Sequence, residues 1–413
     1  SRFIIASDGS LSTPTAGTSN VRFGVNAGNS ITSGGNYNVV VGDEAGTAIN
    51  TGDENTALGY EALDALNTGS RNVAIGKGAL TADTKGEQSV AVGANALQTQ
   101  NFTSLTNTFN TAVGYFAGQA LTTGTINTLI GGQAGANLTT ENSNVFVGYN
   151  SGQFNTTGAQ NTFLGTKAGQ GITGTKLTGN NNVAVGFQAG LVLQGTATLN
   201  TFMGVDAGLS VTTGTNNTLV GGLAGDAITT GADNTFLGKN AGDTCSTGSF
   251  NTALGKGADV GDGAASGRIA IGINVNTTAN DTISVGAGTN KASLTLDGSD
   301  TSWAASSDER LKENIVESTA GLSFINDLRP VTYNWKKAKD VPSDLPQYVE
   351  GLDDPCLGHE YGTQLHGFIA QEVKTVIDNH AEVKDGQAVW KTDETTVQAL
   401  APAALIPMLV KAI

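Results

Sequence analysis

The fold is decided by a short repeated stretch, which is clearest in Asn161-Thr162-Phe163-Leu164-Gly165. The pattern is Asn, then Thr or Val, then two apolar residues, then Gly. With looser copies included, it occurs sixteen times in the first 300 residues, and its closing glycine recurs most often every 17 residues. A fixed period of this kind indicates a repeat architecture. Other clear copies are residues 38–42, 55–59, 72–76, 127–131, 234–238 and 251–255.

Each repeat contains one apolar stretch bounded by Asn and Gly, which is typical of a short strand. The rest of the repeat is rich in Thr and Gly, as in residues 122–124 and 212–214, and such residues form turns. A unit of 17 residues is too short for a pair of helices, but it can form one coil of a β-solenoid. We therefore expect a mainly β protein with a solenoid or β-roll shaft over residues 20–290.

The two apolar residues of each repeat are adjacent, so they point to opposite faces of a strand. In the copy quoted above, Phe163 and Leu164 cannot both enter one core. One is expected inside the coil, and the other against a second layer or a neighbouring chain. The recurring Asn is expected to bond to the Asn one coil away, and the recurring Gly to form a corner with positive φ. A disordered linker would not keep the apolar pairs in fixed phase.

Composition excludes several classes of protein. The chain has 413 residues, a net charge of −15 and no basic stripe, which argues against nucleic-acid binding. No apolar run is long enough to cross a membrane, so no membrane insertion is expected. Two cysteines, Cys245 and Cys356, are too few for a disulfide framework. The chain begins at Ser1 rather than Met and without a secretory signal, so we expect it to start partway along a longer protein.

The composition changes near residue 300. Residues 301–413 hold 6 of the 57 glycines, 6 of the 7 prolines and all three histidines. This shift indicates a second domain of a different kind. We expect a lead-in over residues 1–19, the shaft over 20–290, a linker over 291–306 and a C-terminal domain over 307–413.

Three ordered motifs mark the C-terminal domain. They are Ser-Ser-Asp-Glu-Arg-Leu-Lys-Glu-Asn-Ile at 306–315, Gly-Phe-Ile-Ala-Gln-Glu-Val at 367–373 and Leu-Ile-Pro-Met-Leu-Val-Lys-Ala-Ile at 405–413, with a strand-like stretch at 330–335. Together they resemble the intramolecular chaperone domain at the C-terminus of endosialidase tailspikes and phage tail fibres. The resemblance implies a small α+β domain that ends in a helix. The repeats themselves loosely resemble the β-roll heads of trimeric adhesins.

The resemblance also implies a self-cleaving folding clamp. Domains of that family trimerise, align three fibre chains and then cut themselves off just before the motif serine. By position, the nucleophile is Ser307, its basic partner is Lys312, and the scissile bond is Ser306–Ser307. A lysine can activate a serine hydroxyl only as the neutral amine, which burial favours. The alternative is structural: Ser307 caps a helix that has acids in its first turn, and Lys312 is a solvated charge.

Other candidate chemistry is weaker. Cys356, His359 and His366 make an incomplete zinc set, so no metal site and no cofactor are expected. The acidic pairs at 43–44 and 53–54 could serve a glycosidase, but solvated turn charges explain them better. The glycine-rich stretch 221–226 fits neither a phosphate loop nor a calcium loop. The stretch 351–362 is expected to be an exposed loop. The family commonly continues beyond its last helix into further heptads, whereas this sequence ends at Ile413.

These observations together predict a structural and binding protein. We expect a homotrimeric phage tail fibre, made in the host cytoplasm and carried outside the cell on the virion. It would contact a bacterial surface receptor, either a glycan or an outer-membrane protein, and other tail proteins. Self-cleavage by the Ser–Lys pair is the enzymatic activity expected of it. The alternatives are a tailspike that depolymerises surface glycans and a bacterial trimeric adhesin.

Overall fold

The computed structural model describes most of the chain as two compact units, Ser1–Ser306 and Ser307–Ile413. The described residues are 4–5, 11–12, 17–296, 304–305, 313, 315, 317–345, 347–356, 362, 364–384, 389–392, 398–400 and 405–412.

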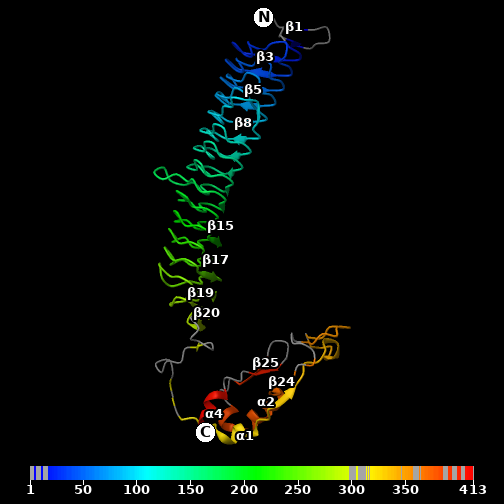
Figure 1. The fold of residues 1–413 in the computed structure, drawn as a ribbon, viewed down its shortest axis with the longest axis vertical. Coiled ribbons are helices and arrows are strands. Elements are labelled where there is room, and N and C mark those ends of the chain that lie inside the picture. Colours follow the sequence, from blue (N-terminus) through cyan, green and yellow to red (C-terminus); the bar gives the residue numbers. More distant parts are fainter. Residues whose placement is uncertain are drawn as a thin grey trace. The chain divides into compact units, whose positions relative to one another are not determined.

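The first unit is a β-solenoid, as the repeat predicted (Figure 1). Each coil contributes one short parallel strand, and sixteen such strands stack into a continuous sheet along one flank. They are β3 (Val21–Phe23), β4 (Val39–Val41), β5 (Thr56–Leu58), β6 (Val73–Ile75), β8 (Val90–Val92), β10 (Thr111–Val113), β11 (Thr128–Ile130), β12 (Val145–Val147), β13 (Thr162–Leu164), β14 (Val183–Val185), β15 (Thr201–Met203), β16 (Thr218–Val220), β17 (Thr235–Leu237), β18 (Thr252–Leu254), β19 (Ile269–Ile273) and β20 (Thr282–Ala287).

The register of the sheet follows the repeat. Phe146 of β12 pairs with Phe163 of β13, which is 17 residues later. The next coil is longer, yet Phe163 still pairs with the equivalent residue of β14, Ala184. The extra residues of long coils therefore lie in the turns and leave the sheet unchanged. Two further short strands, β7 (Gly86–Glu87) and β9 (Thr106–Asn107), pair in parallel beside this sheet.

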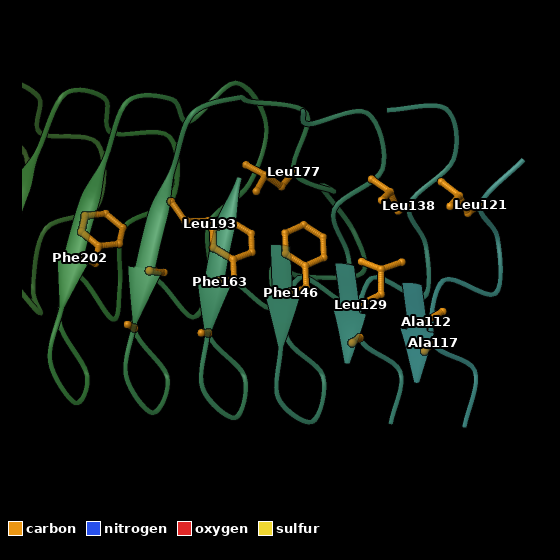
Figure 2. Close-up of a cluster of buried hydrophobic side chains, with 14 of the residues drawn as sticks. Ala112, Ala117, Leu121, Leu129, Leu138, Phe146, Phe163, Leu177, Leu193 and Phe202 are labelled. Carbon is orange, nitrogen blue, oxygen red and sulfur yellow. The ribbon is translucent and has the colours of Figure 1, made fainter. Parts of the chain in front are cut away.

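Positions in each repeat are counted here from the Asn as the first. The third residue points into the coil and the fourth points outward. Phe163 is completely buried, whereas Leu164 is 37% exposed. The prediction that only one of the two enters the core is therefore confirmed. Figure 2 shows the third residues, among them Phe146 and Phe163, stacked in one row inside the shaft; the rings of these two are 4.9 Å apart.

From Asn20 to Asn251 the first residues of the repeats form the predicted asparagine ladder; in the last two coils this position holds Arg268 and Thr282. The side-chain oxygen of Asn217 accepts hydrogen bonds from the backbone and the side chain of Asn234, at 3.1 and 3.0 Å. The Asn217 amide donates to the side chain of Asn200 and to the carbonyl of Gly231, at 3.2 and 2.9 Å. Every polar atom of this buried side chain is thereby satisfied, which removes the cost of burying it. The closing glycines have positive φ, for example 140° at Gly238, so the predicted corners are confirmed.

The ladder is interrupted once, at Ser89. Here two core positions that most other coils fill with an apolar residue hold Asp83 and Gln100, which are almost completely buried. The Gln100 amide donates to Asp83 at 2.6 Å and to Ser89 at 2.8 Å, and its oxygen accepts from Asn110 at 2.9 Å. Burial raises the pKa of the Asp83 carboxyl. The repeat pattern gives no indication of this polar network.

The solenoid sheet ends in antiparallel strands, β21 (Asn290–Thr295) and β22 (Ala304–Ala305). Near the start of the chain, β1 (Ile4–Ile5) and β2 (Leu11–Ser12) form a separate antiparallel pair.

The second unit is a small α+β domain that ends in a helix, as predicted. Its core consists of Ala320, Phe324, Leu328, Val373, Ile377, Val383, Val389 and Leu405. Its elements are α1 (Leu322–Asp327), β23 (Val331–Tyr333), the 3-10 helix η2 (Ala338–Asp340), β24 (Leu365–Gly367), α2 (Ala370–Asn379), α3 (Ala381–Lys384), β25 (Trp390–Thr392), β26 (Gln398–Leu400) and α4 (Ile406–Ala412).

Candidate functional site

The expected cleavage residues Ser306, Ser307 and Lys312 lie outside the described residues. Their roles therefore stay predictions. The structure describes two other features that bear on function. One is the outward face of the shaft sheet, and the other is the set of side-chain contacts within the C-terminal unit.

The outward face of the shaft carries an apolar residue at the fourth position of every coil. We call this line of side chains the outer row; it runs from Phe23 to Val285. Eight of its sixteen members are exposed, for example Leu58 at 45% and Met203 and Leu237 at 47% each, and the other eight are half-buried. An exposed apolar patch of this length marks a surface that another molecule covers. The sequence predicted this second apolar face, and no other part of the described first unit covers it.

Two further lines of residues flank the outer row. The leading border is the residue just before each Asn, and the trailing border is the residue just after each closing Gly. Both contain large exposed side chains, such as Phe109 (56%) and Phe250 (68%) on the leading border and Tyr115 and Tyr149 (54% each) on the trailing border. These side chains widen the apolar surface on both sides of the outer row.

A different flank of the shaft is polar and saturated with hydrogen bonds between coils. The hydroxyl of Thr122 donates to the carbonyl of Thr139 at 3.0 Å, and the hydroxyl of Thr139 donates to the carbonyl of Thr156 at 3.0 Å. The same contact joins Thr212 to Thr229. This flank therefore needs no covering layer, in contrast to the outer row.

The acidic pairs considered as glycosidase acids serve as links between coils. Asp43 accepts from the backbone of Val25 at 3.0 Å, and Asp53 accepts from the backbone of Asn36 at 2.7 Å. Glu44 accepts from the side chain of Asn26 at 2.8 Å. These hydrogen bonds give the carboxylates a structural role in the turns.

In the C-terminal unit, a histidine joins three helices. His380, which follows α2, is only 8% exposed and packs edge-on against the ring of Phe324 in α1. Its Nε2 lies 2.9 Å from Asp327 and its Nδ1 lies 2.8 Å from Glu382. Both nitrogens can donate only when the ring is protonated. The hydrogen bonds to Asp327 and then to Glu382 accordingly raise the pKa of His380.

The glutamate of the second sequence motif, Glu372, forms an ion pair. Glu372 in α2 faces Arg329, whose Nε lies 2.9 Å from Oε2, and a second guanidinium nitrogen contacts the other oxygen. Such two-point contacts fix both side chains in one orientation. The Arg329 guanidinium lowers the pKa of Glu372. The contact links residues 43 positions apart, so the sequence pattern could not indicate it.

In the stretch 351–362, where a loop was expected, residues 351–354 and 362 are exposed, and Pro355 and Cys356 are half-buried. Asp353 at its start pairs with Lys339 at 2.7 Å and Lys337 at 2.9 Å. These two cations, Lys339 first, hold the pKa of Asp353 at about 2. The loop is thereby tied to the 3-10 helix η2.

The structure describes two of the three zinc candidates. Cys356 is a half-buried free thiol, His366 is an exposed residue of β24, and His359 lies outside the described residues. Among the residues that the structure describes, no three His, Cys, Asp or Glu side chains are grouped closely enough to hold a metal ion.

The final helix α4 packs on α1 and leaves an apolar face uncovered. Ile406 is 58% exposed, Leu409 is 41% exposed and Val410 is 70% exposed. Beside it lies an apolar hollow of about 320 Å³, lined by Ile325, Leu328, Pro330, Phe368, Leu405 and Leu409. The longest described helix of the unit, α2, has ten residues, and none in the described part of the chain is long and apolar enough to span a membrane.

The comparisons with known proteins agree with the motifs. Residues 307–382 match the family model described as chaperone of endosialidase. No curated protein and no solved structure matches the chain. The protein thus combines a β-solenoid of about sixteen turns with an endosialidase-type chaperone domain, as the sequence predicted.

Proposed function

We propose that this protein, with its solenoid shaft and its endosialidase-type chaperone domain, is a homotrimeric phage tail fibre or related virion appendage that attaches to the bacterial surface. The observation that carries the proposal is the outer row, which is apolar at every coil and has exposed members from Phe23 to Val285. A chaperone domain of this family beside such a row is what an assembling fibre needs. Three identical chains can cover one another's rows, and the assembly then stays closed.

Cyclic symmetry suits this shaft because the three outer rows can meet around one axis. The row has no charged member among its sixteen residues, so its burial costs no desolvation of charge. Covering the row also removes large apolar side chains from water, which stabilises the assembly by roughly 25 cal/mol for each Å² of apolar surface buried. The polar Thr-rich flank then faces outward, where its hydroxyl and amide groups can contact a glycan or an outer-membrane protein.

The chaperone domain is proposed to cut itself off after assembly. The Ser307 hydroxyl attacks the carbonyl carbon of Ser306, while neutral Lys312 accepts the hydroxyl proton and returns it to the departing amine. This shifts the acyl group from nitrogen to oxygen and forms an ester. Water then hydrolyses the ester, leaving a carboxylate on Ser306 and restoring the hydroxyl of Ser307. Burial of Lys312 in the trimer would keep its amine neutral and so delay the cut until assembly.

The two adjacent serines, Ser306 and Ser307, provide a test variant and a matched control for the cleavage. The intact mass of the purified protein should show fragments 1–306 and 307–413, and Ser307→Ala should abolish them. Ser306→Ala is the matched control: it keeps the nucleophile, so cleavage should continue and the larger fragment should lose the mass of one oxygen. Cleavage that survives Ser307→Ala, or that stops in Ser306→Ala alone, contradicts the assignment.

Attachment is tested with fluorescently labelled protein on intact cells of a panel of bacterial strains. We expect saturable binding to a subset of strains, lost after periodate if the receptor is a glycan or after protease if it is a protein. Shortening of the surface glycan on incubation would instead support the depolymerase. An absence of saturable binding across the panel contradicts a role in attachment.

A further inference from the structure

At three coils, those of β10, β15 and β17, the two borders of the outward face carry complementary residues at equal height, and these pairs indicate how copies of the chain meet. At each coil, the leading-border residue and the trailing-border residue flank the same strand and are six positions apart. Resting on the proposed trimer, we infer that the leading border of one chain packs on the trailing border of the next chain, strand level for strand level. The partner is thus a second copy, placed parallel and in register.

The geometry within one chain keeps the borders apart. A three-residue strand and the residue at each of its ends separate the two borders, which places them roughly 15–20 Å apart, so their side chains on one strand do not touch. Rotation about an axis along the shaft moves each residue without changing its height. Three sheets that face such an axis therefore meet with unlike borders at each junction, whereas an antiparallel pair would join like borders.

At two coils both borders carry a large apolar residue. On β10, Phe109 and Tyr115 are 56% and 54% exposed, so an aromatic side chain stands at each end of the strand. On β15, Leu199 and Val205 are 56% and 53% exposed, and both ends are aliphatic. Within one chain the two border side chains of a coil do not contact each other, so their shared apolar character does not stabilise the fold. Across a junction each pair would remove two apolar groups from water together.

At the coil of β17 the two borders carry opposite charges. Asp233 stands on the leading border and Lys239 on the trailing border, and both are exposed. Neither has an ion-pair partner of opposite charge among the described residues; the one contact of the Asp233 carboxylate is a hydrogen bond from Asn216 at 3.0 Å. Across the junction the carboxylate of one copy and the ammonium of the next would lie at the same height.

One level carries like charges, and it is already satisfied within the chain. On β6, Arg71 lies near Glu87 at 4.0 Å, and Lys77 lies over the ring of Tyr60 at 5.7 Å. Two coils carry a charged residue on both borders. The coil with like charges has partners for them within the chain, and the coil whose charges have no ion-pair partner among the described residues carries opposite charges. This difference is expected if the borders are built to meet each other.

Cysteine cross-linking tests the junction in the full chain. In a Cys356→Ser background, the pair Asp233→Cys with Lys239→Cys is treated with bismaleimidoethane and run on a denaturing gel. Cys245 stays, because it is completely buried and burial raises the pKa of its thiol to about 11. We expect covalent dimers and trimers from the double variant, and monomers from each single variant, since a border does not meet itself.

The outcomes separate this inference from the trimer itself. A trimeric native mass combined with no cross-link in the double variant, or with a cross-link in a single variant, overturns the border pairing and leaves the trimer standing. A monomeric native mass overturns both. As a second readout, Lys239→Asp should raise the dissociation constant of the trimer about tenfold, because three junctions change at once, and Asp233→Lys added to it should restore the affinity. Failure of that rescue also contradicts the pairing.

Discussion

The aromatic ring of Phe236 fills the space into which a side chain at Gly242 would project. A Cβ at Gly242 would lie 2.2 Å from Cε2 of the ring, which is too close for any residue but glycine. In another coil the same two positions hold Ala57 and Leu63, both completely buried. The third and ninth residues of a coil thus share one volume, and when one is large the other is small.

This exchange of volume predicts compensation between the two sites. Phe236→Ala alone should cost about 3–5 kcal/mol through the cavity that it leaves. Gly242→Leu alone should also destabilise the shaft by about 1–3 kcal/mol or more, because the leucine cannot fit beside the ring. The double variant reproduces the pair Ala57 and Leu63, whose leucine has the same left-handed backbone at φ 53°.

Chemical denaturation followed by circular dichroism measures the effect. The loss of unfolding free energy in the double variant should be smaller than the sum of the two single losses by at least about 2 kcal/mol. Additive losses would show that the two positions do not share space.

The asparagine ladder predicts a large penalty for a small polar deletion. Asn217→Ala removes the acceptor of two bonds from Asn234 and leaves the Gly231 carbonyl without its donor. Buried groups left without partners cost about 1–3 kcal/mol each, so we expect a loss of roughly 2–4 kcal/mol in unfolding free energy. Thr213→Ala, an exposed residue of the preceding turn, is the control and should change stability by less than about 0.5 kcal/mol. Equal effects of the two substitutions would argue against the ladder.

The outer row predicts loss of assembly without loss of fold. Leu237→Asp puts a charge into the middle of the proposed trimer interface, where it would be desolvated. We expect the dissociation constant to rise at least about a hundredfold, while the circular dichroism spectrum of the coils stays unchanged. Thr230→Asp, on the exposed polar flank, adds the same charge and should leave assembly intact. Similar behaviour of the two variants would contradict the assignment of the interface.

His380 predicts that the chaperone domain loses stability as the pH rises. Its pKa is raised in the folded state by Asp327 and Glu382, so the stabilisation is fully present below the unfolded pKa of about 6.5. It is lost as the pH rises through the higher folded pKa. Two of the three tryptophans, Trp335 and Trp390, lie in this domain, so tryptophan fluorescence reports mainly on its unfolding.

The measurement is the midpoint of thermal unfolding between pH 6 and pH 9. The midpoint should fall with rising pH in the natural sequence and much less in His380→Gln, which keeps a donor but cannot be protonated. An identical pH profile for the two would show that the histidine contributes no titrating contact.

The repeat made the solenoid predictable because strand pairing and the ladder join equivalent positions of successive 17-residue units, so the period alone places them. Phase alone placed Phe163 and Leu164 on opposite faces and Asn217 in a ladder. The exchange between Phe236 and Gly242 was not foreseen, since it depends on how two positions share a volume. Asp83 and Gln100 break the pattern, so a pattern could not find them. His380 and Asp327 are far apart in sequence and meet only through the folded helices.

The native mass of the full chain, measured before and after processing, tests the trimer most directly. We predict an initial particle of three times 41.8 kDa, which persists as a trimer of the shaft once the chaperone domain is released. A mass of 41.8 kDa at micromolar protein concentration, from a chain whose coils are folded, would contradict the account.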